Sequence, residues 1–279
     1  MRTIAIQRDP RFSPNSVEKD LAILTAVALP MGGRIVAESQ LTVGDVAEAD
    51  TILNMGRMPQ TLSLLEENAA GKCIVNPAAG IRNCQRSRIT TLMRNADIPI
   101  PPQEGTNGYW IKRGDEAAQT RNDIRYCAND AELEAAKADF RSRGITDIVV
   151  QAHIEGDLVK FYGVEGTAFF RYFYPTDDGT TKFGDEQRNG IAHHYPFDLE
   201  ALATTANRLA ALAETPVYGG DAIITADGAF CIIDFNDWPS FSRCRDEAAK
   251  AIIAYVAARQ EMCRDGTHQF RFRTVRKRI

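Results

Sequence analysis

Short apolar runs alternate with segments of helical periodicity over the first ninety residues. Apolar side chains recur at helical spacing from Val17 to Ala28, and Gly32-Gly33 ends that helix. A second helical segment covers 59–67. The β-type runs between these segments are 3–7, 34–37, 51–53 and 73–75. Strands that alternate with helices are typical of a parallel sheet flanked by helices, so this part predicts a small α/β domain.

The pattern changes after the proline-rich segment Ile98-Pro99-Ile100-Pro101-Pro102. Proline cannot continue the helix expected at 86–95, so this segment is typical of a connector. Beyond it, the pattern predicts strands at 109–112, 124–127, 148–154, 158–164 and 168–174, and helices at 130–143, 199–213 and 246–262. The predicted fold is therefore α/β and α+β. Its parts are a parallel α/β domain at 1–85, two α+β lobes at 86–150 and 151–265, and a basic tail at 266–279.

Two carboxylates stand out in the apolar segment 220–236. Asp227-Gly228 between two β-type runs predicts a two-residue hairpin turn. Asp221 precedes that turn by as many residues as Asp234 follows it, so the two would face each other, and Asn236 would share their face. Like charges so placed are destabilising. We therefore predict that Asp221, Asp234 and Asn236 bind a hard cation, Mg²⁺. The alternative is a surface hairpin, against which the isoleucines on both faces argue.

Composition and charge exclude several classes of protein. With 279 residues, 44% hydrophobic and 25% charged, the chain is globular rather than disordered. A net charge of −4 gives no field that recruits nucleic acid or a membrane, and the apolar stretch at 21–31 is too short to span a bilayer. The start of the chain is typical of a strand rather than a signal peptide. Six cysteines without C-x-x-C spacing and four histidines predict reduced thiols, a cytoplasmic location and no zinc site.

Two lysines complement the predicted metal ligands. Lys112 ends an apolar strand beside a polar loop, and Lys160 lies within a later strand. A lysine in a strand indicates little alone, because its stem packs on apolar surface. In this order, however, two cations followed by oxygen ligands for Mg²⁺ are what a nucleoside triphosphate requires.

On these residues the chain resembles the ATP-grasp superfamily over residues 50 to 262. It is similar in particular to the glutamate-ligase and glutathione-synthetase-like enzymes and to the inositol trisphosphate kinases. The D-x-N-x-x-P element from Asp234 to Pro239 is the most specific part. The segments that carry the resemblance are Tyr109-Trp110-Ile111-Lys112, Val149-Val150-Gln151-Ala152-His153-Ile154-Glu155-Gly156, Leu158-Val159-Lys160-Phe161-Tyr162-Gly163-Val164, Gly219-Gly220-Asp221-Ala222-Ile223-Ile224 and Ile233-Asp234-Phe235-Asn236-Asp237-Trp238-Pro239.

The resemblance implies an ATP-grasp fold in which two α+β lobes grip ATP behind a small α/β domain. Lys112 would contact the α- and β-phosphates and Lys160 the γ-phosphate, while Arg88 would take the place of a phosphate-facing lysine. The metal ligands would again be Asp221, Asp234 and Asn236. The segment between the lobes would bind adenine through Gln151, Ala152, His153 and Ile154, with Glu155 or Asp157 near the ribose.

The chain also departs from the pattern of the superfamily. Ala152 stands where an acid usually follows the hinge glutamine, and Asp234 stands where glutamate is frequent. Ser240 replaces a familiar glycine, and Gly114 is the lone glycine of the loop after Lys112. These departures leave ATP as the expected ligand and leave the acceptor open.

The acceptor would meet the stretch that follows Asn236. Arg243 and Arg245 there could clamp a carboxylate or phosphate, or they could be solvated charges at a helix start. Arg171, the pair His193-His194 and the basic tail are further candidates, each with a solvated surface as the alternative.

The predicted function is that of an Mg-ATP-dependent ligase. Such an enzyme would activate a carboxylate as an acylphosphate and join it to an amine of a small molecule or peptide, with Lys160, Arg243 and Arg245 as catalytic residues. A small-molecule kinase with the same ATP site is the alternative, and fold-level likeness does not decide between them. A third alternative, a nucleotide-binding module without turnover, is disfavoured because both lysines and all three metal ligands are present.

Overall fold

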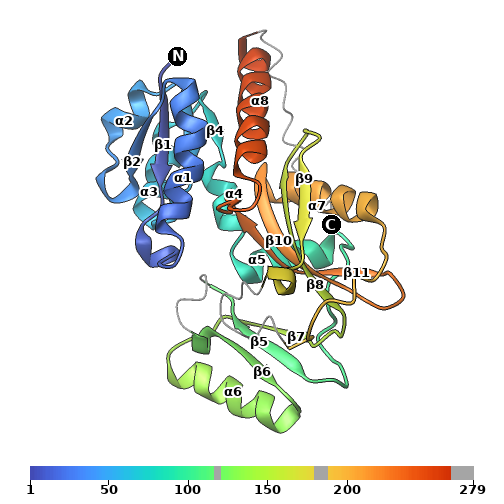
Figure 1. Cartoon of the computed structure of the whole chain (residues 1–279). Coiled ribbons are helices and arrows are strands. Elements are labelled where there is room, and N and C mark those ends of the chain that lie inside the picture. The colour runs from blue at the N-terminus through green and yellow to red at the C-terminus, as the bar shows by residue number, and fades with distance from the viewer. Residues whose placement is uncertain (116–120, 179–187, 265–279) are drawn as a thin grey trace, which may run out of the picture.

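A computed structural model of the chain describes residues 1–115, 121–178 and 188–264, which contain three sheets (Figure 1). The first sheet has the order β2-β1-β3-β4, with every pair parallel. Its strands are β1 (Thr3–Gln7), β2 (Arg34–Ala37), β3 (Thr51–Asn54) and β4 (Cys73–Val75). The parallel sheet predicted from the alternation of strands and helices is therefore confirmed.

Helices cover both faces of this parallel sheet. They are α1 (Val17–Ala28), α2 (Val43–Glu48), α3 (Pro59–Asn68) and α4 (Ala78–Asn83), with 3₁₀ turns η1 (Pro10–Phe12), η2 (Leu29–Met31) and η3 (Glu38–Gln40). The sequence pattern misses α2 and α4, because a helix of under two turns shows no periodicity. A capping box nevertheless starts α2: Thr42 Oγ1 accepts from the Asp45 amide, and Asp45 Oδ2 accepts from the Thr42 amide.

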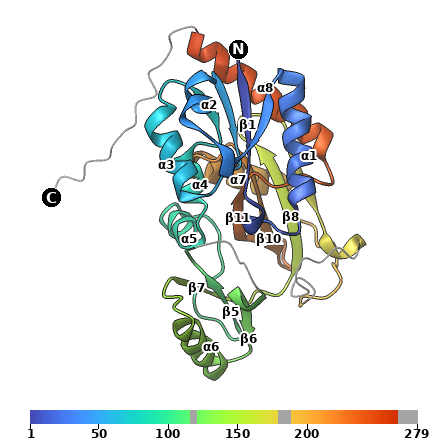
Figure 2. The same ribbon diagram turned by 90° about the vertical axis from the view of Figure 1, so that its left-hand side faces the viewer.

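The second sheet is small and antiparallel, with the order β6-β5-β7, and it lies at the lower end of the molecule in Figure 2. Its strands are β5 (Tyr109–Arg113), β6 (Ile124–Cys127) and β7 (Ile148–Ala152), and η4 (Arg121–Asp123) precedes β6. Helix α6 (Asp130–Ser142) packs against Ile111 and Cys127 on one face. Because side chains alternate along a strand, Trp110, Lys112 and Gln151 lie on the opposite face.

The third sheet is antiparallel, with the order β11-β10-β8-β9. Its strands are β8 (Asp157–Val164), β9 (Phe170–Phe173), β10 (Val217–Ile224) and β11 (Phe230–Asp237). Helices α5 (Arg86–Asn95) and α7 (Leu199–Ala213) cover one face, where Ile89 and Leu209 join Phe161 and Phe235 in one core. The other face carries Lys160, Asp221 and Asp234. The chain continues through η5 (Pro175–Asp178) after β9 and ends its described part with α8 (Arg245–Arg264).

The hairpin of β10 and β11 pairs Asp221 with Asp234, as predicted, but its loop and the register next to that loop differ from the prediction. The predicted two-residue turn is wrong. Thr225 N donates to Ala229 O, and Gly228 N donates to Thr225 O, both at 2.9 Å, which makes a three-residue loop with Gly228 at φ 83°. This loop shifts the pairing next to the turn by one residue. As a result, Ala222 pairs with Ile232 and not with Ile233. Ile233 is left unpaired as a bulge, so the next pair, Asp221 with Asp234, returns to the predicted register.

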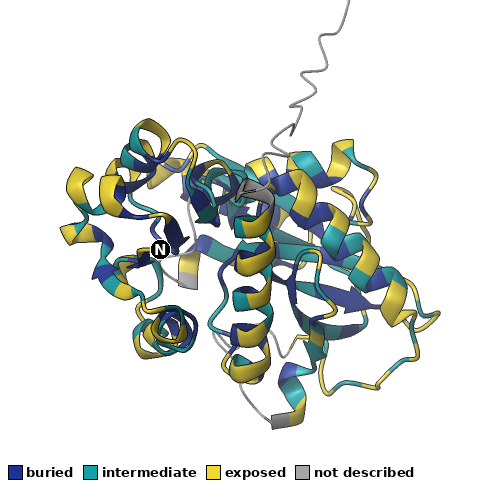
Figure 3. Ribbon diagram, turned by 90° about the horizontal axis from the view of Figure 1, so that it is seen from above, coloured by how far each residue is buried: buried dark blue, intermediate teal, exposed yellow. Residues whose placement is uncertain are grey.

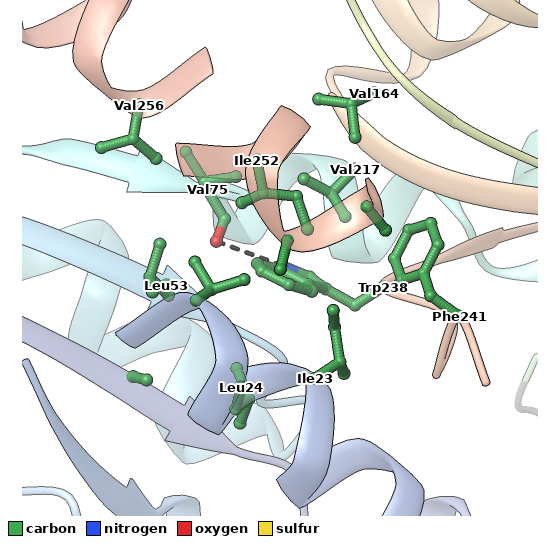
Figure 4. Packing of buried hydrophobic residues seen from close by; sticks show 14 of the residues in the cluster. Ile23, Leu24, Leu53, Val75, Val164, Val217, Trp238, Phe241, Ile252 and Val256 are labelled. Atoms are coloured by element: carbon green, nitrogen blue, oxygen red, sulfur yellow. Dashed lines mark hydrogen bonds between the residues drawn. The ribbon is translucent and has the colours of Figure 1, made fainter. Parts of the chain in front are cut away.

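The largest hydrophobic cluster joins the first sheet to the third. Helix α8 packs beside α1 over the parallel sheet, and the buried Trp238 lies at the centre of the cluster (Figure 4). Viewed from above, buried positions face inward between these elements and exposed positions lie on the outer helix surfaces (Figure 3). Because this core crosses the predicted boundary at residue 85, α8 stabilises both sheets together. The boundaries at 85 and 150 stay predictions, and the predicted tail at 266–279 lies outside the described residues.

Among the described helices, none is both long enough and apolar enough to cross a membrane.

Candidate active site

Lys112 connects the second sheet to the third. It lies near the end of β5, only 7% exposed, and its Nζ donates to Gln151 Oε1 at 2.8 Å and to the Ile233 carbonyl at 3.1 Å. Gln151 belongs to the neighbouring strand β7, whereas Ile233 is the bulged residue of β11. The lysine is therefore held at the junction of the two sheets, beside Asp234.

Lys160, Asp221 and Asp234 form a row across three adjacent strands. Lys160 of β8 pairs with Asp221 of β10, which pairs with Asp234 of β11. Lys160 Nζ lies 3.1 and 3.2 Å from the two oxygens of Asp221. All three side chains are about a quarter exposed, so the row is accessible from one face of the sheet.

A third cation comes from α5, and it is Arg86 rather than the predicted Arg88. Arg86 Nη2 lies 3.7 Å from Asp234 Oδ2, and Nη1 donates to the Arg113 carbonyl at 2.7 Å. Arg88 is exposed and lines an open hollow together with Leu212. Two residues turn a helix by about 200°, so the two arginines lie on opposite sides. Ile89 is three residues after Arg86 and buried, which is the sequence signal that favours Arg86.

The five charged groups partly neutralise one another. Three cations and two carboxylates leave one positive charge, so the like-charge repulsion predicted across the hairpin is offset by Lys160 and Arg86. Burial alone would raise the pKa of Asp234, but Arg86 and then Lys112 outweigh it and hold that pKa below its usual value. Burial lowers the pKa of Lys112 to about 8, although Asp234 opposes this shift.

The resemblance implies that Lys112 contacts a phosphate of ATP, and its low pKa then predicts that nucleotide affinity falls at alkaline pH. Below pH 8 the ammonium is available to a phosphate, and above pH 8 it loses its proton. We expect affinity for Mg-ATP to fall about tenfold between pH 7.5 and 9.5, because one charge-assisted contact is lost. Calorimetry across this range measures it, with Lys112→Met as the control whose profile should be flatter. A flat profile for the unchanged protein would contradict the prediction.

The same shift acts on stability in the opposite direction. The pKa of Lys112 is lower in the folded protein than the ordinary value of 10.5. Between pH 8 and 10.5 the unfolded chain therefore binds more protons at this group, and the contribution of this group to the free energy of unfolding rises with pH. Deprotonation of Lys112 above pH 8 therefore does not unfold the protein, and the expected fall in nucleotide affinity has to be a binding effect.

Asp221, Asp234 and Asn236 form an oxygen donor set. Asn236 is two residues beyond Asp234 on β11, and a hydrogen bond from its side chain helps to keep the pKa of Asp234 low. Two carboxylates and an amide oxygen fit Mg²⁺, whose remaining positions waters and phosphate oxygens usually fill. The part of the chain that the structure describes contains no cluster of three or more His, Cys, Asp or Glu side chains that could hold a metal ion.

The segment between β7 and β8 offers a backbone donor. The Ala152 amide donates to the Pro102 carbonyl at 2.7 Å, and the His153 amide donates to the Gly108 carbonyl at 2.8 Å. No described residue accepts a hydrogen bond from the Ile154 amide. This amide is therefore one of the groups of the segment that remain available to a ligand.

Comparison with known proteins rests on structure alone, since no family model and no curated protein matches the sequence. A D-alanine–D-alanine ligase from Bacillus anthracis, complexed with ATP, is 11% identical with a TM-score of 0.61, covering 94% of this chain and 98% of that one. D-cycloserine synthetase DcsG is 13% identical with a TM-score of 0.61, covering 91% and 99%. A RimK-domain ATP-grasp protein from Sphaerobacter thermophilus is 17% identical with a TM-score of 0.58, covering 91% and 99%. The chain has the ATP-grasp fold.

An aromatic cluster that the sequence analysis missed lies beside the segment between β7 and β8. Trp110 Nε1 donates to His153 Nδ1 at 3.1 Å, and Tyr126 packs edge-on against both rings. The Arg188 guanidinium lies 3.4 Å from the centroid of the Tyr126 ring. Burial, and then Arg188, lower the pKa of His153. The sequence signal is strand alternation, because Trp110 is two residues before Lys112 and shares its face.

The two residues that were predicted to lie near the ribose differ in exposure. Glu155 is exposed and accepts a hydrogen bond from Asn107 Nδ2 at 3.2 Å. Asp157 is buried, and its oxygens accept the amides of His193 at 2.7 Å and Tyr195 at 2.9 Å. Asp157 therefore holds the chain around 193–195, and of the two predicted ribose contacts the exposed Glu155 is the more accessible. A polar residue at a strand start does not by itself reveal such a backbone partner.

The arginines that were predicted to bind the acceptor lie in different surroundings. The exposed Arg243 lies 5.3 Å from the ring of Phe173, which pairs across the sheet with Lys160. Arg245 starts α8, and its Nε is buried without a hydrogen bond in the described structure. Arg171 forms an ion pair with Glu247 on the surface. Arg243 is thus the candidate whose contact leads to the row of Lys160, Asp221 and Asp234, through Phe173.

The remaining two candidates also have partners. His193 faces Asp157, with Nδ1 3.4 Å from Oδ1, and His194 Nε2 lies 3.2 Å from Asp177 Oδ1. These contacts favour a structural role for both histidines. Most of the loop after Lys112 lies outside the described residues, at 116–120.

Proposed function

We propose that this chain is an Mg-ATP-dependent ligase that activates a carboxylate as an acylphosphate and joins it to an amine. The observation that carries the proposal is the meeting of Lys112, Lys160 and Arg86 with the oxygen donors of β10 and β11. The fold supports it, because a D-alanine–D-alanine ligase with ATP bound and D-cycloserine synthetase share it.

ATP would lie between the second and third sheets. The Ile154 amide would bind the adenine, and the aromatic cluster of Trp110, Tyr126 and His153 would pack beside it. The three cations would bind the phosphates through charge-assisted hydrogen bonds. Asp221, Asp234 and Asn236 would hold Mg²⁺, which would neutralise charge on the β- and γ-phosphates.

The residues of this site would position the two substrates for two successive displacements. An oxygen of the substrate carboxylate bonds to the γ-phosphorus while the bond between that phosphorus and the bridging oxygen breaks, releasing ADP. The amine nitrogen then bonds to the acyl carbon, the bond to the phosphate oxygen breaks, and the nitrogen loses a proton. Lys160 and Arg86, which contact Asp221 and Asp234, would face the transferred group and stabilise the negative charge that accumulates on it.

The acceptor would approach from the side of Arg243. This arginine is exposed on the loop after β11 and stacks near Phe173 of the strand next to Lys160. A guanidinium in that position suits a carboxylate of the acceptor or of the acyl donor.

A product assay tests the proposal and separates it from the kinase alternative. The unchanged protein is incubated with Mg-ATP and a pool of amino acids, dipeptides and other carboxylates, and the products are identified by mass spectrometry. A ligase releases ADP and phosphate in equal amounts with a new amide, and only when an amine is present. A kinase releases ADP and leaves the phosphate on the acceptor. Absence of Mg-ATP binding in calorimetry would overturn both.

A further inference from the structure

The end of β11 is tied to the first sheet immediately after the proposed metal ligand Asn236. Asp237 is only 3% exposed, and its carboxylate receives two contacts from Arg57, at 2.5 Å from Nη2 and 3.4 Å from Nε. Arg57 lies in the loop that follows β3 (Thr51–Asn54). A two-point guanidinium–carboxylate contact restricts orientation as well as distance.

The next residue, Trp238, is held by the same sheet. Its carbonyl accepts a hydrogen bond from Arg8 Nη2, and its indole Nε1 donates to the Val75 carbonyl at 3.1 Å, the dashed line in Figure 4. Its own amide donates to the Val217 carbonyl at 3.0 Å. Trp238 adopts φ 34°, a backbone conformation that side chains other than glycine seldom adopt, so these contacts must impose it.

The loops that carry the two arginines are themselves fixed. Glu38 is buried, and its Oε2 accepts the amides of Arg57 at 2.7 Å and Met58 at 2.8 Å. Arg8 is buried, with Nε 3.2 Å from Asp20 Oδ2. The guanidinium of Arg57 is thus bonded to Asp237 and held by a loop whose own amides are fixed by a buried carboxylate.

Strand geometry relates this tie to the proposed metal site. Asn236 and Asp237 are consecutive residues of β11, so their side chains point to opposite faces of the sheet. Asn236 shares its face with Asp234, while Asp237 contacts Arg57 of the first sheet's β3–α3 loop. Opposite Asn236 stands Gly219, where a Cβ would lie 2.9 Å from Pro239 Cγ, so the chain after Trp238 folds closely back over the site.

We propose that Arg57 is a positioning residue whose ion pair with Asp237 fixes the Asn236 amide oxygen as a ligand of the metal. This inference rests on the proposed function. If Arg57 has this role, the packing of the first sheet on the end of β11 affects the affinity for the metal. Residues that hold metal ligands in place commonly affect metal affinity in this way. Arg57 acts through Asp237 and touches neither ATP nor the metal.

Metal binding in the presence of a non-hydrolysable ATP analogue tests this role. Mn²⁺ serves as the spectroscopic probe, and its affinity is measured by electron paramagnetic resonance on the unchanged protein and on Arg57→Ala, Arg57→Lys and Asp237→Asn. We expect Arg57→Ala and Asp237→Asn to weaken Mn²⁺ binding about 10- to 100-fold. Arg57→Lys should recover part of the affinity, since it keeps the charge but not the two-point contact.

Two comparisons separate positioning from a merely structural role. Affinity for the analogue in EDTA should change less than about twofold in all variants, because the cations that bind phosphates are untouched. Arg82→Ala is the matched control. It removes an arginine of the same part of the chain whose partner, Glu66, is on the surface, and it should leave Mn²⁺ affinity unchanged.

The outcomes are distinct. If Arg57→Ala does not fold, as the loss of one partner of a buried ion pair can cause, Arg57→Lys and Asp237→Asn decide the question. Folded variants that bind Mn²⁺ as tightly as the unchanged protein overturn the positioning role and leave the proposed function standing. An unchanged protein that binds neither analogue nor Mn²⁺ overturns both. Equal weakening of metal binding and of metal-free nucleotide binding would mean a general structural effect, which also overturns the positioning role.

Discussion

Asp234→Asn is expected to reduce turnover by roughly a thousandfold or more while the protein remains folded. Asp234 is the carboxylate at which Arg86, Lys112 and Asn236 converge, and it is one of two acids in the proposed metal site. Its replacement removes a charged ligand and one negative charge from a site that already carries more cations than acids. Asp221→Asn should act similarly, and Asn236→Ala more mildly because a neutral ligand is lost.

Turnover and metal dependence in the product assay measure this effect, and thermal unfolding reports folding. Asp227→Asn is the matched control, since it makes the same change in the exposed loop of the same hairpin. Because Asp221 and Asp234 already face cations, their replacement should not raise the melting temperature of the metal-free protein. Asp234→Asn protein with full turnover would refute the assignment of this carboxylate to the metal.

Lys112→Met is expected to weaken Mg-ATP binding at least about tenfold and also to destabilise the protein. The first effect follows from the loss of a charge-assisted contact to phosphate. The second follows because Gln151 Oε1 and the Ile233 carbonyl lose their shared donor at the junction of two sheets. A buried acceptor left without a partner costs about 1–3 kcal/mol.

Calorimetry with Mg-ATP and thermal unfolding without nucleotide measure the two effects separately. Lys137→Met is the control, because Lys137 lies on α6 and pairs with Glu134 at the surface. A Lys112→Met protein with unchanged affinity would remove this lysine from the phosphate site. Unchanged stability would show that water or a rearranged side chain replaces its two contacts.

Much of the fold follows from local pattern in the sequence. The helices at 17–28, 86–95 and 199–213 were predictable, because each buries one face and its apolar residues repeat at the helical period. The four parallel strands were predictable as short apolar runs between helices, since such strands are buried on both faces. The pairing of Asp221 with Asp234 agrees with the prediction, but the two-residue turn from which it was predicted is absent. The three-residue loop and the bulge at Ile233 each shift the register by one residue, and their effects cancel.

Only the tertiary structure decided which polar residues meet. The choice of Arg86 over Arg88 depends on which face of α5 packs on the third sheet, and the burial of Asp157 depends on the amides of a distant loop. The contact between Arg57 and Asp237 joins residues 180 positions apart. Periodicity in the sequence determines which face of an element is apolar. It does not determine which distant polar group lies against that element, because that is set by the packing of whole elements on one another.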